Sequence, residues 1–179
     1  AKRRPVRRGH DRPRRENPGP GPVPCSRHAG ESGFTLMDKQ SLQQTYDARY
    51  AGDYMDADAY TAWVHDGLAV HRVRTTLQQM AAAPQRVLDY GCGQGKWVTL
   101  LRSLYPRAAI SGIDVSAVAV DKAASKHPGC GFAAFDGERA PFEDGEFDLV
   151  FSFHVLEHGL DVELSIRDIA RLIRAGGHA

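Results

Sequence analysis

The chain has 179 residues and a formal net charge of +1, which conceals two unlike parts. Residues 1–33 hold nine basic and three acidic side chains, a net charge of +6, together with six of the ten prolines; the other 146 residues carry a net charge of −5. A segment with almost no large apolar side chain cannot bury enough surface to offset the entropy of ordering. We therefore predict a disordered tail over residues 1–36.

This composition excludes several classes of protein. No apolar run approaches the roughly 20 residues of a membrane span, and the Arg- and Pro-rich N-terminus lacks the apolar core of a secretory signal. Cys25, Cys92 and Cys130 are too widely spaced for a disulfide framework or a zinc cluster. We expect a cytoplasmic protein with no membrane partner and one folded domain after the tail.

Three interpretations of the tail stay open. Met37 is the first methionine, so the tail is explained as sequence upstream of the domain's own start, or as a natural solvated extension. As a third interpretation, eight of the first fifteen residues are basic and would bind the phosphates of a nucleic acid. No aromatic residue is interleaved for base stacking, so we do not expect a nucleic-acid partner.

In chain order, the remaining residues alternate between helical and extended patterns. Apolar residues at spacings of three and four indicate amphipathic helices, as with Val70 and Val73, and Pro84 and Pro106 end two of them. Ser116 is a suitable N-cap for the helix that follows it. The predicted helices span residues 41–50, 57–82, 96–105, 117–126 and 161–174, and the predicted strands span residues 86–90, 109–114, 131–135 and 147–153.

Strands that alternate with helices predict an α/β fold, a Rossmann-like three-layer α/β/α sandwich with a mostly parallel sheet. The last predicted helix is expected to end at a Gly176 cap. Its expected core stripe consists of Val162, Ile166, Ile169 and Ile173. Ligands of such sheets bind beyond the carboxyl ends of the strands, near the switch in strand order. Those ends are predicted at residues 89–95, Asp114, Asp136 and residues 152–158.

The glycine cluster after the first predicted strand, residues 89–95, reads DYGCGQG. A phosphate loop is excluded, because Tyr90 stands where the first glycine is required and Trp97 stands where a Ser or Thr would hold magnesium. A dinucleotide fingerprint needs a third glycine where this chain has Lys96, which weakens that interpretation without excluding it.

Four segments resemble the class I S-adenosylmethionine-dependent methyltransferases. VLDYGCGQG resembles the first motif of that family, GIDVS (residues 112–116) the second, and FDGERAPFEDGEFDLV (residues 135–150) the third. FSFHVLEH, followed by IRAGG, resembles the family's fourth strand and the segment before its fifth. The order and spacing of these segments, from Val87 to Gly177, are similar to the branch of the family that methylates small molecules.

The resemblance implies S-adenosyl-L-methionine as the cofactor and nine residues that contact it. Asp89 would attract the ammonium group, Asp114 would accept hydrogen bonds from the ribose hydroxyls, and Asp136 would accept from the adenine amino group. Glycine backbone and apolar side chains would form the rest of the site. These remaining residues are Gly91, Gly93, Gly95, Val115, Gly137 and Phe153.

The resemblance also places the methyl acceptor just past the fourth strand, where His154, Glu157 and His158 are candidates for a catalytic base. A purely structural role, in which Glu157 and His158 orient the next helix, is the alternative. The segment also spells the H-x-x-E-H signature of a zinc-peptidase group, but it follows a buried strand and only 21 residues remain for a third ligand. Some relatives place an E-x-x-E-H cluster here to bind a divalent metal, and in this chain His154 replaces the first acid. We assign no metal ligand to this chain and leave open whether His154, Glu157 and His158 bind a metal.

In relatives, the N-terminal helices fold over the cofactor. The resemblance therefore implies a helical lid over residues 37–85, lined by Tyr46 or Tyr50, and a cofactor-binding domain over residues 86–179. The family's sheet has seven strands, and this chain ends where the fifth would begin. We expect the fourth strand to be an uncovered edge, with an intact glycine loop but weak cofactor binding and poor turnover.

The sequence thus predicts a methyltransferase that acts on a small-molecule acceptor, with the acceptor atom (O, N or C) and the oligomeric state left open. A truncated non-catalytic module for cofactor binding or assembly, an NAD(P)-dependent oxidoreductase and an RNA methyltransferase guided by the basic tail are the alternatives.

Overall fold

The computed structural model describes residues 38–52, 67–80 and 83–179. The predicted tail, Cys25 and the predicted helical residues 57–66 lie outside these ranges. The described elements are α1 (Lys39–Ala51), α3 (Gly67–Gln78), β1 (Arg86–Tyr90), α4 (Lys96–Leu104), β2 (Ala109–Asp114), α5 (Ala117–Lys126), β3 (Gly131–Ala134), β4 (Phe147–Phe151), the short 3₁₀ helix η1 (Leu156–His158), α6 (Val162–Leu172) and β5 (Ile173–His178).

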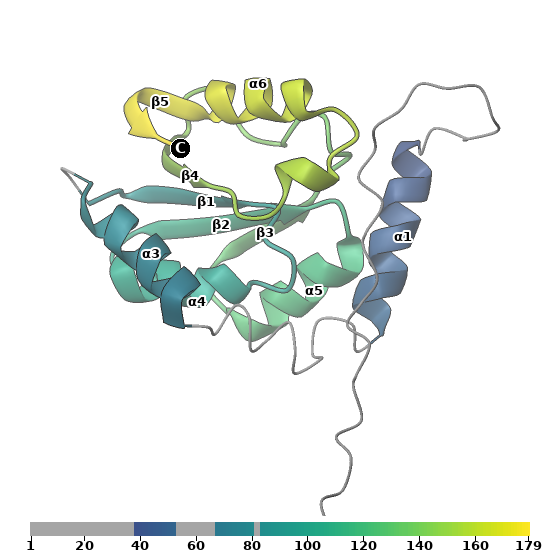
Figure 1. The fold of residues 1–179 in the computed structure, drawn as a ribbon, viewed down its shortest axis with the longest axis horizontal. Helices are drawn as coiled ribbons and strands as arrows, with labels where there is room; N and C mark the ends of the chain where they lie inside the picture. The colour runs from purple at the N-terminus through teal and green to yellow at the C-terminus, as the bar shows by residue number, and fades with distance from the viewer. Residues whose placement is uncertain (1–37, 53–66, 81–82) are drawn as a thin grey trace, which may run out of the picture. The chain divides into compact units, whose positions relative to one another are not determined.

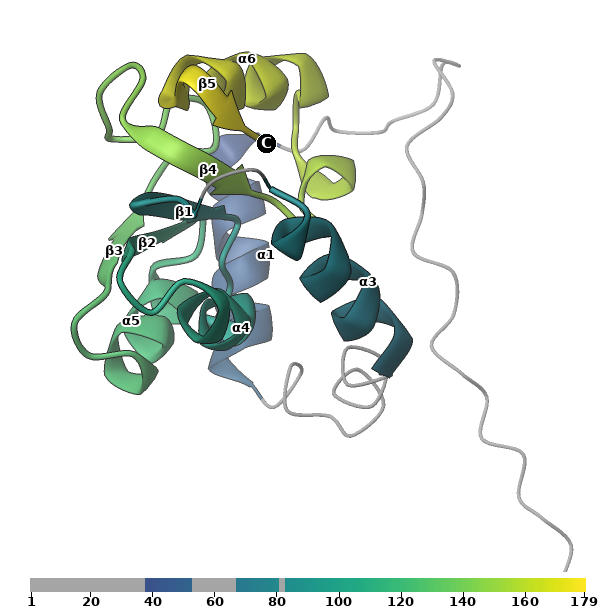
Figure 2. The same ribbon diagram turned by 90° about the vertical axis from the view of Figure 1, so that its left-hand side faces the viewer.

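The five strands form one parallel sheet in the order β3-β2-β1-β4-β5. Helices cover both faces: α6 lies on one, and α3, α4 and α5 lie on the other (Figures 1 and 2). This arrangement confirms the predicted three-layer α/β/α architecture. After β1 the chain moves to one side of it for β2 and β3, then crosses to the other side for β4, so the switch in strand order lies between β1 and β4.

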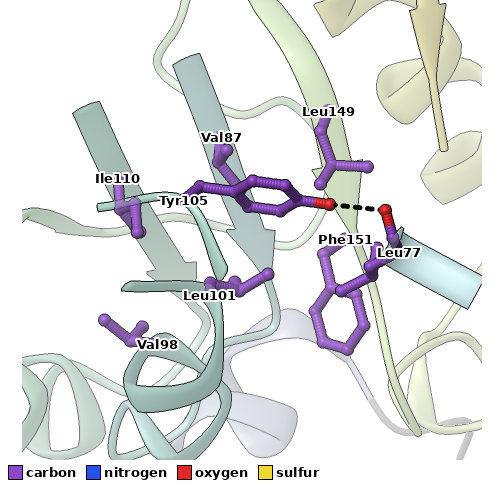
Figure 3. Packing of buried hydrophobic residues seen from close by; sticks show 8 residues of the cluster. All are labelled: Leu77, Val87, Val98, Leu101, Tyr105, Ile110, Leu149 and Phe151. Atoms are coloured by element: carbon purple, nitrogen blue, oxygen red, sulfur yellow. Dashed lines mark hydrogen bonds between the residues drawn. The ribbon is translucent and has the colours of Figure 1, made fainter. Parts of the chain in front are cut away.

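Each face of the sheet carries its own hydrophobic core. On the face covered by α3 and α4, Val87, Leu101 and Leu149 belong to a buried cluster, and the Tyr105 hydroxyl donates to the Leu77 carbonyl at 2.9 Å (Figure 3). On the α6 face, a second cluster includes Leu88. Adjacent residues of β1 thus contribute to opposite cores, as expected for a strand buried on both sides.

Side-chain caps set the start of three helices. Asp38 accepts a hydrogen bond from the Ser41 amide ahead of α1, and Ser116 accepts from the Ala119 amide ahead of α5. Asp161 caps α6 in the same way, by accepting from the Leu164 amide. The Ser116 cap was expected from the sequence and is confirmed.

The C-terminal expectations were wrong in two respects. Residues 173–178 form a fifth strand that pairs in parallel with β4, so β4 is not an edge. Gly176 does not cap α6, which ends at Leu172; it lies within β5 with a φ of +77°. The physical reason is that β4 offers unpaired backbone groups along its outer side, which the next segment satisfies by pairing. The pairing is irregular, with a register shift between Phe147 and Leu149.

The buried face of α6 is also rotated from the expected stripe. The residues buried on this helix are Ser165, Asp168, Ile169 and Leu172. Val162 and Ile166, both expected in the core, are 44% and 51% exposed. Asp168 takes its buried position because it forms an ion pair with Arg171 at 2.7 Å and accepts from the Ala140 amide at 2.8 Å. An apolar spacing alone could not reveal that partner.

None of the helices in the described ranges has the length and hydropathy needed to traverse a bilayer.

Candidate functional site

A cavity opens at the carboxyl ends of β1 and β2, beside α1, and encloses about 800 Å³ of empty space, part of it open to solvent. Its wall combines three parts of the chain: α1, the segments that follow β1, β2 and β3, and the segment between β4 and α6. Figure 1 shows α1 standing beside this end of the sheet. The predicted site residues that line the cavity are Tyr46, Tyr50, Gly91, Asp114, Val115, Asp136, Gly137, His154 and His158.

The glycine loop and Asp114, which we call the cradle (residues 89–95 with Asp114), form the innermost part of the site. Gly91, Gly93 and Gly95 all have positive φ, at +81°, +51° and +77°. Residues other than glycine rarely adopt such φ values. At Gly91 a side chain is also excluded for lack of space, because a Cβ there would lie 2.3 Å from Val155 Cγ2. The glycines are therefore required by both conformation and space.

Asp89 is the penultimate residue of β1 and lies inside the cradle, only 1% exposed. Its Oδ2 atom has no hydrogen-bond partner among the described residues. Burial, with a smaller contribution from the negative charge of Asp114, raises the pKa of Asp89 to about 8. A buried carboxyl oxygen without a donor suits a ligand that brings one.

Asp114 is the second buried acid of the cradle, 7% exposed. Its two oxygens accept separate backbone hydrogen bonds, Oδ2 from the Gly93 amide at 2.8 Å and Oδ1 from the Ser116 amide at 2.9 Å. Burial raises the pKa of Asp114, and the hydrogen bonds from these amides oppose that rise. The carboxylate fixes the loop and still has free lone pairs on the cavity side.

Asp136 lies at the outer end of the cavity with its side chain 54% exposed. Its Oδ1 accepts from the amides of Glu138 and Arg139, and its Oδ2 forms an ion pair with Lys39 at 3.1 Å. The Glu138 amide first, and the Lys39 side chain after it, lower the pKa of Asp136. Lys39 also contacts Glu138 at 2.6 Å, so α1 is attached to the segment after β3.

The other end of α1 is attached to α5. The Asp47 carboxylate accepts from the Ser116 hydroxyl, and Lys122 donates to the Tyr50 carbonyl. The Tyr50 ring reaches the cradle, where a Cβ on Gly93 would lie 2.8 Å from its hydroxyl. Helix α1 thus covers the cradle from the solvent side. Sequence reasoning expected the tyrosines here but missed Lys39 and Asp47, whose partners are distant in the chain.

The segment from His154 to Asp161, which we call the rim, forms the opposite wall. His154 has a φ of +56°, and it is the only non-glycine residue in the described ranges with positive φ. Its Nδ1 lies 2.7 Å from Glu157 Oε1. Burial opposes ionisation of Glu157, but its own backbone amide and His154 outweigh that effect and lower its pKa. His158 meets the edge of the Tyr46 ring, with 6.4 Å between centroids.

Five predicted site residues do not line the cavity. Asp89, Gly93 and Gly95 lie behind its wall, within the cradle, and Glu157 reaches it through His154. Phe153 is turned away: its ring packs on Trp97 with 4.7 Å between centroids and on the core beneath α3 and α4. The structure does not bring Phe153 to the cavity, because β4 ends at residue 151, two residues earlier than expected.

The end of α5 braces the cradle from behind, a feature that the sequence did not reveal. Lys126 donates to Gln94 at 2.8 Å, and a Cβ on Gly95 would lie 2.7 Å from the His127 ring. Burial lowers the pKa of His127, so the ring that supports Gly95 is neutral at pH 7. The H-P-G sequence that ends α5 indicates a helix end but not a contact with the loop.

Within the described ranges, no group of three or more His, Cys, Asp or Glu side chains is arranged to hold a metal ion. Within the H-x-x-E-H motif, the Nδ1 atom of His154 lies 2.7 Å from Glu157 Oε1, so these two side chains contact each other. Cys92 and Cys130 are free thiols.

Comparisons with known proteins agree with this geometry. The family described as "Methyltransferase domain" matches residues 88–179. The malonyl-[acyl-carrier protein] O-methyltransferase of Legionella pneumophila is 33% identical over 112 residues, which cover 59% of this chain and 38% of that protein. The phthiotriol/phenolphthiotriol dimycocerosates methyltransferase of Mycobacterium leprae is 29% identical over 60% of this chain and 40% of its own length.

Solved structures support the fold. A putative methyltransferase in complex with the Haloferax volcanii Trm112 methyltransferase activator gives a TM-score of 0.59 at 25% identity, over 74% of this chain and 57% of that chain. The complex of DhpI with SAH gives 0.58 at 22% identity, over 80% and 68%. The chain spans about two fifths of the length of the curated relatives it matches. The chain belongs to the methyltransferase domain family, the class I S-adenosylmethionine-dependent methyltransferases whose motifs its sequence carries.

Proposed function

We propose that this protein transfers a methyl group from S-adenosylmethionine to a small-molecule acceptor. The observation that carries the proposal is the cradle: a loop with three left-handed glycines, bounded by two buried carboxyl groups, at the switch point of a parallel sheet. The orphaned Asp89 oxygen and the Asp114 carboxylate supply the oxygen acceptors that the ammonium and ribose groups of this cofactor need.

The cofactor would occupy the cavity with its charged end toward the cradle. Asp114 would accept from the ribose hydroxyls with the lone pairs that its amide partners leave unused. Val115 would lie against the adenine, and Gly137 would offer a backbone amide beside Asp136. For Asp136 to accept from the adenine amino group, that group must share or replace the Lys39 contact.

Helix α1 is the proposed lid. Tyr46 and Tyr50 line the cavity, and the contacts of Lys39 and Asp47 hold the helix at both of its ends. As a lid, α1 would move to admit the cofactor, and these polar contacts would then break and re-form during each binding event. If neither Tyr46→Ala nor Tyr50→Ala weakened cofactor binding, the lid proposal would be wrong.

The cofactor supplies a methyl group already activated on a sulfonium. The chain's own task is then to position the acceptor, exclude water and take its proton. His154 is the proposed base, because it lines the cavity and its Nδ1 contacts Glu157, which orients the ring. His158, also on the wall, is the second candidate.

A small acceptor group is supported by the names of the two relatives, one of which is a malonyl-[acyl-carrier protein] O-methyltransferase and the other a phthiotriol/phenolphthiotriol dimycocerosates methyltransferase. The free thiols of Cys92 and Cys130 support a cytoplasmic location.

Thermal shift and calorimetry with S-adenosylhomocysteine and with NADH test the proposal. We expect saturable stabilisation by S-adenosylhomocysteine and none by NADH. Stabilisation by NADH alone would indicate the oxidoreductase interpretation, and no binding of either would indicate a non-catalytic module. Once an acceptor supports turnover, His154→Ala should lower kcat by about 100-fold while the affinity for S-adenosylhomocysteine stays unchanged.

A further inference from the structure

The cradle contains two buried acids, and the hydrogen bonds allow their charge states to be assigned. Each oxygen of Asp114 accepts a hydrogen bond from a backbone N–H group. A protonated carboxyl group would turn its own O–H toward one of these donors, so the arrangement indicates the ionised form. Asp89 is more deeply buried, and its Oδ2 has no donor among the described residues. A second negative charge beside Asp114, without a donor, is unfavourable in this environment.

The other neighbours of Asp89 do not change this assignment. On β4 it pairs with Phe151, which is apolar. In the loop, burial raises the pKa of the Cys92 thiol well above its usual range, so the thiol is uncharged at neutral pH. From β2, Asp114 adds negative charge. The raised pKa of Asp89, about 8, agrees with a carboxyl group that holds its proton in the ligand-free protein.

We propose that Asp89 is uncharged while the site is empty and loses its proton when a cationic amino group enters, so that cofactor binding releases one proton. The proposal rests on the proposed function and adds a property of the site, a proton-releasing ammonium subsite. Tyr90 and Gly91, which follow Asp89 directly, line the cavity. An ammonium group beside Gly91 would meet the carboxyl group past this glycine or through one water molecule, and either contact favours the ionised form.

The proton balance is simple. The O–H bond of the Asp89 carboxyl group breaks, its proton passes to the buffer, and the carboxylate pairs with an ammonium that was charged before it bound. At pH 6.5 an α-amino group is already almost fully protonated, so the ligand takes up little or no proton of its own. The ammonium subsite therefore selects a cation without a second negative charge buried beside Asp114 in the absence of ligand.

Calorimetry of the whole chain with S-adenosylhomocysteine, at pH 6.5 in phosphate, PIPES and imidazole buffers, measures this proton. The binding enthalpy should vary linearly with the ionisation enthalpy of the buffer, with a slope of close to one proton released. The affinity should rise from pH 6 toward pH 8, by up to about tenfold per pH unit. 5′-Methylthioadenosine, which lacks the amino acid part, should bind with no proton release and little dependence on pH.

Asp89→Asn supplies the matched variant, because it keeps the shape of the side chain and removes its proton exchange. It should abolish the proton release, weaken S-adenosylhomocysteine by at least tenfold and leave the affinity for 5′-methylthioadenosine unchanged, which also verifies that the variant is folded. Ionising a buried Asp89 is unfavourable, so the ligand-free wild type should lose stability as the pH rises from about 4 to about 8. The ligand-free variant should lose less stability over this pH range. At pH 8 it should unfold at the same temperature as the wild type or at a higher one.

The outcomes separate the two proposals. Binding of S-adenosylhomocysteine without proton release, or release that persists in Asp89→Asn, would overturn the inference and leave the methyltransferase proposal intact. In the second case Asp114 would be the source of the proton. Failure of both ligands to bind would overturn the proposed function itself.

Discussion

The two walls of the cavity, the cradle and the rim, differ in backbone conformation and in the exposure of their charged side chains. In the cradle, positive φ values occur only at glycines, the acids are buried, and backbone amides hold Asp114. In the rim, a histidine takes the positive φ, and its partner Glu157 is about half exposed at the side chain. The cradle is therefore fixed by the fold, whereas the rim holds a local strain that folding alone does not require.

Under the proposed function, the difference suggests a division of tasks between the two walls. A cofactor that is the same in every reaction suits a site set by backbone geometry, which few substitutions can adjust. An acceptor that differs between relatives suits exposed side chains between β4 and α6, where a change costs little stability. The contrast can be tested by substitutions placed in one wall at a time.

The largest effect is expected from Gly91→Ala. The new Cβ would collide with Val155 at 2.3 Å and would have to adopt a φ of +81°. Affinity for S-adenosylhomocysteine should fall by at least about 100-fold, or about 3 kcal/mol. Gly129→Ala is the control, since that glycine also has a positive φ (+90°) but no neighbour within 4 Å. It should cost about 1 kcal/mol of stability and leave cofactor affinity unchanged.

Equal loss of affinity in both glycine variants, measured by calorimetry, would mean that general destabilisation rather than the shape of the cradle governs binding.

Asp114→Asn should have the second largest effect. The amide group would turn a donor toward one of two backbone donors, Gly93 or Ser116, and would lose the negative charge. We expect a loss of about 1–3 kcal/mol in the free energy of unfolding. Cofactor affinity should fall by about tenfold or more, as expected when one charged hydrogen bond is lost.

Asp148→Asn separates these two effects. Asp148 also accepts two backbone amides, from Gln85 and Arg86, but at the opposite end of the sheet. Denaturant unfolding should detect a destabilised protein, and calorimetry should find unchanged cofactor affinity. If Asp148→Asn weakened the cofactor as much as Asp114→Asn, the affinity would reflect global stability and not the cradle.

These contrasts also show what the sequence could predict. Periodicity and glycine spacing predicted β1 and β2 to the residue, and they placed Asp89 and Asp114 at the strand ends. Such signals are local, because each follows from a few adjacent residues. The contacts of Lys39 with Asp136 and of His127 with Gly95 join segments far apart in the chain, and no local pattern contains them.

The departures from the expectations have the same origin. The family resemblance implied Phe153 beside the cofactor, but the chain leaves β4 at Phe151, before the left-handed turn at His154, and the Phe153 ring packs on Trp97. Ile166 was placed in the core because its spacing is helical. The structure instead buries Asp168, whose charge is paired with Arg171. In both cases, a specific tertiary partner or backbone turn outweighed a local preference.

The rim should respond differently from the cradle. His154→Gly removes the strain of a side chain at a φ of +56°, so it should raise the free energy of unfolding by about 1 kcal/mol. The affinity for S-adenosylhomocysteine should stay unchanged. His154→Ala keeps the strain and loses the Glu157 contact, so it should not stabilise the protein. Both variants remove the proposed base. A His154→Gly protein that is less stable than the wild type would show that the left-handed turn is not strained.

The smallest effect is expected from Lys39→Ala, which tests whether the lid belongs with the cradle or with the rim. Lys39 reaches Asp136 and Glu138, but all three side chains are close to half exposed, and exposed ion pairs contribute little. Affinity for S-adenosylhomocysteine should change by about twofold at low salt and by less at high salt, because salt screens exposed charges. Arg167→Ala removes an exposed ion pair with Glu163 on α6, and it should leave the affinity for S-adenosylhomocysteine unchanged at both low and high salt. A loss of more than tenfold that persists at high salt would mean that the α1 contact is part of the binding site, so that the lid shares the fixed geometry of the cradle.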